Sequence, residues 1–204
     1  MKYFLKQYNT KSQQGFTLIE TIVAIFILSL TIGALLSLAA GGFYSVRYSR
    51  NQLVAENLIQ ESIEYIRNSR DTALQQDVLW TNWLTTLNVD SNGVSAPYGS
   101  STQGCFSTNG CMIDPYTSGA KVKACGASCP TVLFFPNQSF YGYSGATYPF
   151  SDSGAYATTY VRTITVAVSP SDSNQATVTA RISWQNGNTT KTTTQSVIMT
   201  NWRP

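Results

Sequence analysis

A long apolar segment near the N-terminus constrains the fold of this chain more than any other feature. Between Glu20 and Arg47 no side chain carries a charge, and a helix needs only about 20 apolar residues to cross the hydrocarbon of a bilayer. The flank before this segment carries three lysines and no acid: Lys2, Lys6 and Lys11. Because positive flanks stay in the cytoplasm, we expect one transmembrane helix over about 17–44, with its N-terminus inside and the rest of the chain outside.

The junction in front of this segment is ordered differently from a secretory signal. In a secretory signal the small-residue cleavage site follows the apolar core. Here Gly15 stands before the core and is followed at once by Phe16 and, one turn on, by the acid Glu20. A peptidase that cuts after Gly15 would therefore act at the cytoplasmic face and leave the apolar helix on the mature chain.

The run Gly15-Phe-Thr-Leu-Ile-Glu20, placed ahead of a spanning helix, resembles the processing site of type IV prepilins and type II secretion pseudopilins. The resemblance implies that a prepilin peptidase removes residues 1–15 and methylates the new amino terminus at Phe16. It also implies that Glu20 acts in assembly. A lone carboxylate is costly in lipid, and the amine of Phe16, on the same or a neighbouring subunit, would neutralise it. Thr17-Leu-Ile-Glu20 alone also fits a capping box on an uncleaved anchor helix.

The net charge of the chain comes from this leader. The full sequence has 13 Lys and Arg against 10 Asp and Glu, so removing the three leader lysines leaves ten of each sign. A neutral mature chain has no basic stripe for phosphates, which argues against nucleic acid as a partner. The sequence also has no histidine, which removes the Ser–His and Cys–His nucleophile pairs. We therefore expect neither an enzyme nor a bound cofactor.

The helix is expected to continue past the membrane, over 16–71 in all. Apolar residues there recur mostly at spacings of three to five, as in an amphipathic helix: Leu53, Val54, Leu58, Ile59, Ile63 and Ile66. The Gly41-Gly42 pair marks a candidate bend, since each glycine costs about 1 kcal/mol in a helix. The stretch from Ala55 to Asp71 resembles the post-membrane helix of minor pilins and small pseudopilins, which implies a minor subunit.

The remaining residues, 72–204, are expected to form an exported globular domain. A short amphipathic helix over 78–87 carries Trp80 and Trp83 on one face, where core packing is their expected role. Alternating apolar and polar residues then predict a β-meander over about 160–200, with a hairpin turn at 185–188. The fold class is α+β, and a long N-terminal helix packed on a C-terminal antiparallel sheet is the pilin-like arrangement that the resemblance implies.

The domain contains four cysteines: Cys105, Cys111, Cys125 and Cys129. An even number outside the cytoplasm predicts two disulfides in this loop region. A four-cysteine zinc site is the alternative, although its spacing departs from the usual pairs, and we expect no metal. Of three connectivities we favour the local pairs, Cys105–Cys111 and Cys125–Cys129; the nested alternative joins Cys111 to Cys125 across a hairpin turning at 115–119.

Two functional classes follow from these features. The first is a minor type IV pilin or pseudopilin, a structural subunit of an envelope-spanning filament that serves pilus assembly or protein secretion. Its implied partners are other pilin subunits, the prepilin peptidase, an assembly platform in the inner membrane, and membrane lipid. It would pass from the inner membrane into an extracytoplasmic filament. The alternative is an adhesin-like or DNA-uptake pilin, a binding module whose Cys- and Tyr-rich middle contacts a target.

Overall fold

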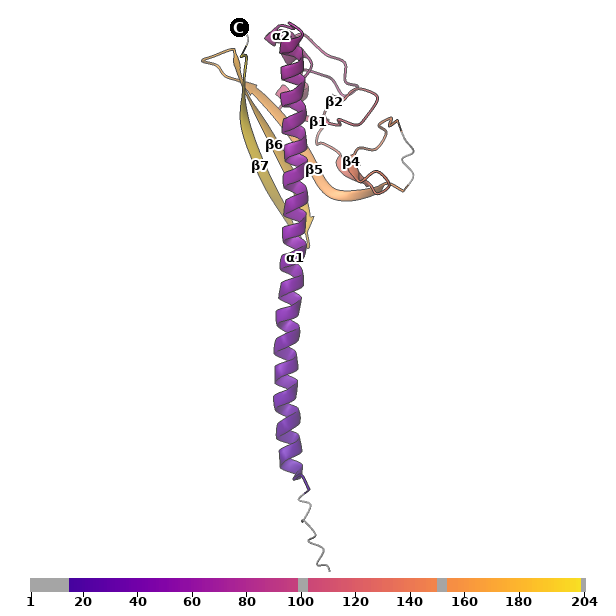
Figure 1. Ribbon diagram of the computed structural model, residues 1–204, viewed down its shortest axis with the longest axis vertical. Helices are drawn as coiled ribbons and strands as arrows, with labels where there is room; N and C mark the ends of the chain where they lie inside the picture. Colours follow the sequence, from indigo (N-terminus) through magenta and orange to yellow (C-terminus); the bar gives the residue numbers. More distant parts are fainter. Residues whose placement is uncertain (1–14, 99–102, 150–153, 203–204) are drawn as a thin grey trace, which may run out of the picture. The chain divides into compact units, whose positions relative to one another are not determined.

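The structure, a computed structural model, describes residues 15–98, 103–149 and 154–202 (Figure 1). The predicted leader, apart from Gly15, lies outside the described residues. The chain divides into two units, residues 1–47 and 48–204, and we call the second unit the globular domain. Helix α1, Leu18–Gln75, contributes to both.

The first part of α1 is an apolar helix with its side chains exposed. Its large hydrophobic residues are exposed from Leu18 to Val46. Two of the hydroxyls within it bond to its own backbone: Ser29 donates to the carbonyl of Ile25, and Thr31 to that of Leu28, each at 2.8 Å. Internal satisfaction of polar groups is what hydrocarbon demands of a spanning segment. Helical structure also continues through Gly41 and Gly42 without interruption.

In the globular domain the second part of α1 packs on the sheet. The residues that it buries follow helical spacing: Ala55, Leu58, Ile59, Ser62, Ile63, Ile66 and Leu74. The amphipathic face expected from sequence is therefore present. Leu53 is the exception, because it is 62% exposed, whereas the neighbouring Val54 is partly buried against the core and Ala55 is fully buried.

Among the described residues, the sheet of the globular domain has seven strands. They are β1 Cys111–Ile113, β2 Val122–Ala124, β3 Thr131–Phe135, β4 Phe140–Gly142, β5 Tyr156–Val168, β6 Gln175–Asn186 and β7 Thr189–Thr200. Every pairing is antiparallel. Strand β5 pairs along one side with β6, which in turn pairs with β7, and along the other side with β1 and β3. Figure 1 shows the long strands β5, β6 and β7 beside the second part of α1.

The meander β5–β6–β7 has one apolar and one hydroxyl-rich face. Ile164, Val178 and Ile182 point inward and are fully buried, while the residues between them form the outer face. There Thr165 pairs with Thr179, which pairs with Ser196. Asn186 pairs with Thr189 across a two-residue turn in which Gly187 has φ +63°. The predicted hairpin is thus confirmed, and β5 begins at Tyr156, earlier than the alternation indicated.

Two short helices complete the domain. Helix α2, Trp80–Thr85, buries both of its tryptophans, and the Trp80 indole donates to the carbonyl of Ser173 at 2.8 Å. The expected core role of this helix is confirmed. The 3₁₀ helix η1, Gly104–Phe106, begins at a residue with φ +56°, where an added Cβ would lie 2.6 Å from the carbonyl oxygen of Leu87. Only glycine fits there.

Candidate processing and assembly site

The Gly15–Phe16 bond lies just before α1, outside regular structure. Phe16 is 82% exposed, and no described atom lies within 4 Å of a Cβ built on Gly15. The bond that the sequence marks for cleavage is therefore in irregular, exposed backbone. Such backbone is the form of chain that a peptidase can bind.

Thr17 caps the helix that follows. The backbone amide of Glu20 donates to the Thr17 hydroxyl at 3.4 Å and to the Thr17 carbonyl at 3.1 Å. This is one of the two hydrogen bonds of a capping box. The other, from the Thr17 amide to the Glu20 carboxylate, is absent among the described residues. Glu20 itself is exposed at the first turn, where a carboxylate favourably faces the positive end of the helix dipole.

The segment beyond Glu20 can cross a membrane by length and composition. Its most apolar window has a mean hydropathy of 2.6, and none of that window is buried within the molecule. The Gly15–Phe16 bond, the cap with its carboxylate, and a helix with an exposed apolar surface thus follow one another directly along the chain.

Comparison with known proteins identifies this arrangement. Residues 10–41 match the family model described as the prokaryotic N-terminal methylation motif. This motif is the hallmark of type IV prepilins and pseudopilins. No curated protein and no solved structure matches the chain. The match covers the end of the leader, the junction and most of the apolar segment of α1, so it carries no information about the globular domain.

The prepilin-type motif is thus joined to a globular domain with two disulfides. Cys105 bonds Cys111, and Cys125 bonds Cys129, with Cα–Cα distances of 4.5 and 4.6 Å. These are the local pairs favoured from sequence. The hairpin of the nested alternative does exist, because β1 pairs with β2 and Cys111 lies opposite Ala124. Its register, however, sets Cys111 beside Ala124 and leaves Cys125 to bond Cys129.

A buried arginine is the main polar feature of the core. Arg162 of β5 is completely buried and donates to the Glu61 carboxylate and to the carbonyls of Leu58 and Ile113. Its guanidinium also lies 5.6 Å from the ring centre of Tyr143, within cation–π range. Burial alone would lower the pKa of Arg162, but Tyr143 and Glu61 raise it, so the group stays charged.

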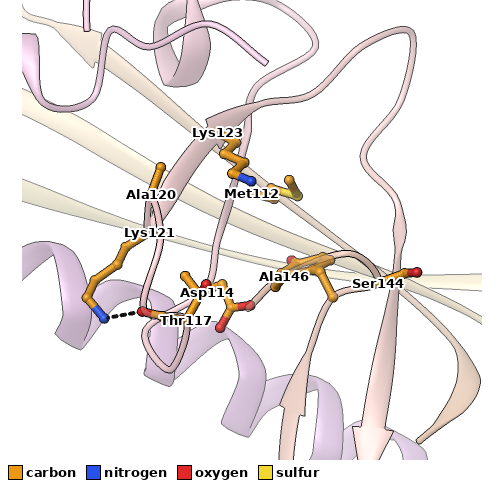
Figure 2. A pocket seen from close by; sticks show the side chains of 9 residues that line it. Met112, Asp114, Thr117, Ala120, Lys121, Lys123, Ser144 and Ala146 are labelled. Atoms are coloured by element: carbon orange, nitrogen blue, oxygen red, sulfur yellow. Dashed lines mark hydrogen bonds between the residues drawn. The ribbon is translucent and has the colours of Figure 1, made fainter. Parts of the chain in front are cut away.

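A second network surrounds Asp114, which is 5% exposed. Its carboxylate accepts hydrogen bonds from the Tyr148 hydroxyl at 2.6 Å and from the Tyr116 amide at 3.2 Å. Burial, with this bond to Asp114, raises the pKa of Tyr148 well above its usual range. Figure 2 shows Lys121 bonded to the carbonyl of Thr117 at a small cavity that Asp114, Ser144 and Ala146 also line. The cavity here holds about 20 Å³, room for one water molecule.

The sequence indicated only part of the network around Arg162. Arg162 has the same strand parity as the inward-facing Ile164 and Val166 of β5, and that parity was the available signal that its side chain points into the core. Its partners could not be found in the same way, because Glu61 and Tyr143 come from α1 and the loop after β4. Nothing in a one-dimensional pattern pairs these segments.

Proposed function

We propose that this chain is a minor pilin or pseudopilin, a structural subunit of an envelope-spanning filament. The observation that supports this best is the methylation motif at residues 10–41, which includes the exposed apolar start of a helix that continues into a disulfide-bonded domain. A prepilin peptidase would cut after Gly15 and methylate Phe16. Residues 17–44 would first hold the subunit in the inner membrane and then pack among the same helices of other subunits.

The orientation follows from charge and redox chemistry. The leader lysines favour a cytoplasmic N-terminus, and the two disulfides suit a domain outside the cytoplasm. Partners of this subunit would be other pilins, the peptidase and an inner-membrane assembly platform. Its role is structural and not enzymatic, since the prepilin family to which the motif points is a structural one.

N-terminal mass spectrometry tests this proposal most directly. The full chain is expressed in cells with a prepilin peptidase and in a matched strain that lacks it. We expect the membrane fraction of the first strain to contain a chain that begins at Phe16 and carries one extra methyl group. The second strain should retain residues 1–15. A leader that stays intact in the presence of the peptidase would contradict the proposal.

A further inference from the structure

The globular domain contains a groove between α1 and the segments around β1 and β4. It encloses about 260 Å³. Its aromatic surfaces are Tyr116, Phe140 and Tyr141, and its polar groups include Asn57, Glu61 and Ser139. The rings of Tyr116 and Phe140 lie 4.9 Å apart, and Tyr116 is 45% exposed. Aromatic walls with a few convergent polar groups are typical of binding sites for small molecules.

This groove is electrically neutral. Its one carboxylate, Glu61, is matched by the buried guanidinium of Arg162 directly behind it. Burial, followed by the charge of Glu61 and a hydrogen bond with it, raises the pKa of Tyr116, so its phenol stays protonated beside that carboxylate. Asn57 is exposed, and its side chain forms no hydrogen bond with the described residues. The groove therefore offers donors and acceptors without net charge.

One backbone position on the rim is strained. Ser139 has φ +56°, in the left-handed region where glycine is favoured and other residues pay a conformational penalty. It stands at the end of the turn between β3 and β4, and its side chain lines the groove. A glycine would relieve the backbone and remove the hydroxyl. The chain keeps the hydroxyl, and strained residues of this kind cluster at functional sites.

We propose that this groove binds a neutral saccharide. The C–H faces of a sugar ring would lie against the rings of Tyr116 and Tyr141, whose negative π faces attract them. The sugar hydroxyls would bond to the side chains of Asn57, Ser139 and Glu61, since hydroxyls both donate and accept.

Other ligand classes fit the groove less well. An anion would meet no cation among the residues that line the groove, and Arg162 behind them is fully buried and already bonded to Glu61, Tyr143 and two carbonyls. Arg50 acts on Tyr141 but does not line the groove. A cation would place an uncompensated charge beside Arg162. An apolar side chain from a neighbouring subunit would leave the Asn57 amide and the Ser139 hydroxyl desolvated without partners. A neutral, hydroxyl-rich ligand avoids all three penalties.

The test measures binding of defined sugars by isothermal titration calorimetry. The full processed chain, in a zwitterionic detergent without sugar groups, is titrated with chitotetraose, maltotetraose and cellotetraose, and with the acidic 3′-sialyllactose. We expect at least one neutral sugar to bind and the acidic one to bind more weakly. Tyr116→Ala and Asn57→Ala should each weaken that binding by about tenfold, which corresponds to 1.4 kcal/mol. Asn57→Ala keeps an exposed helix position filled by the best helix former, so folding is preserved.

Ser139→Gly distinguishes a binding role of Ser139 from a purely structural one. It should raise the melting temperature, because glycine tolerates the left-handed backbone, and should weaken sugar binding at the same time. A purely structural Ser139 would raise the melting temperature and leave binding unchanged. Tyr98→Ala is the matched control, since Tyr98 is an exposed tyrosine that packs on Phe106 and does not line the groove.

Three results would overturn the saccharide site: no binding of any of the three neutral sugars, equal or tighter binding of sialyllactose, or binding unaffected by both Tyr116→Ala and Asn57→Ala. Protection of Tyr116 from iodination in assembled filaments without sugar would assign the groove to a neighbouring subunit instead. The filament proposal does not depend on these outcomes, because it is tested separately at the N-terminus.

Discussion

Arg162 of β5 and Glu61 of α1 lie 101 positions apart in sequence and form an ion pair in the core of the globular domain. The two partners are not equally enclosed: the side chain of Arg162 is 0% exposed and that of Glu61 is 22% exposed. The pair joins the long helix to the middle strand of the sheet. The difference in exposure between the two side chains decides whose removal destabilises the domain more.

We expect Glu61→Leu to destabilise the domain more than Arg162→Met. Loss of Glu61 leaves a fully buried cation without its counter-charge, which costs about 3–5 kcal/mol. Loss of Arg162 leaves a carboxylate that can turn toward water. The double variant should be more stable than Glu61→Leu alone, because two apolar residues replace the pair. Urea unfolding of the full chain in micelles measures all three; losses that are equal and simply additive would contradict this view.

The two disulfides should contribute unequally to stability. Each closes a short loop, so the chain-entropy gain is about 2 kcal/mol in either case. Cys105 and Cys111 are both 0% exposed, whereas Cys125 and Cys129 retain some exposure. We therefore expect Cys105→Ala/Cys111→Ala to lower the free energy of unfolding more than Cys125→Ala/Cys129→Ala, since it also leaves a cavity in the core.

Thiol labelling checks the disulfides themselves. Unfolded, unreduced protein should contain no reactive thiol, and full reduction should release four. Zinc release together with four thiols before reduction would instead indicate the four-cysteine metal site considered from sequence.

Glu20→Ala should impair assembly and leave the globular domain folded. Glu20 lies at the first turn of α1, exposed, and contributes nothing to the core of residues 48–204. Membrane insertion should persist or improve, because a costly charge is removed. Co-purification with other filament subunits measures incorporation, and protease resistance of the domain measures folding.

Glu64→Ala is the matched control for Glu20→Ala. Glu64 lies on the same helix but in the globular domain, where it forms a surface ion pair with Arg67. Surface pairs of this kind contribute little, so incorporation should be unchanged. If Glu20→Ala is incorporated as well as Glu64→Ala, Glu20 acts only as part of the helix cap.

Alkaline pH should destabilise the domain through Tyr160. Burial raises the pKa of Tyr160 to about 12 from the ordinary value of 10. A group whose pKa is higher in the folded than in the unfolded state stabilises the fold below the unfolded pKa, and this stabilisation is lost as pH rises toward the folded pKa. The urea midpoint should therefore fall between about pH 10 and pH 12. Tyr160→Phe should reduce that fall, while Tyr98→Phe provides the comparison at an exposed position.

Periodic features of the fold could be predicted from the chain itself. The amphipathic stretch of α1, the helix at Trp80, and the alternating strands β5 and β6 each have a local cause, namely an apolar face repeated at 3.6 or 2 residues. The hairpin at Gly187 has a local cause as well, since its backbone needs a residue that tolerates positive φ. In contrast, β1 to β4 are three to five residues long, too short for alternation to distinguish them from loops.

The sequence by itself determined the methylation motif and the apolar helix, because each depends on residues close together in the chain. It favoured the local disulfide pairs but left the nested pairing open. Only the tertiary structure decided which residues meet in the buried ion pair and in the groove. Arg162 meets Glu61 and Tyr143, and the groove brings Asn57 of α1 to Tyr116 and Ser139, because antiparallel pairing onto β5 and packing of α1 set these segments together. Such contacts join residues far apart in sequence, and no local periodicity carries information about them.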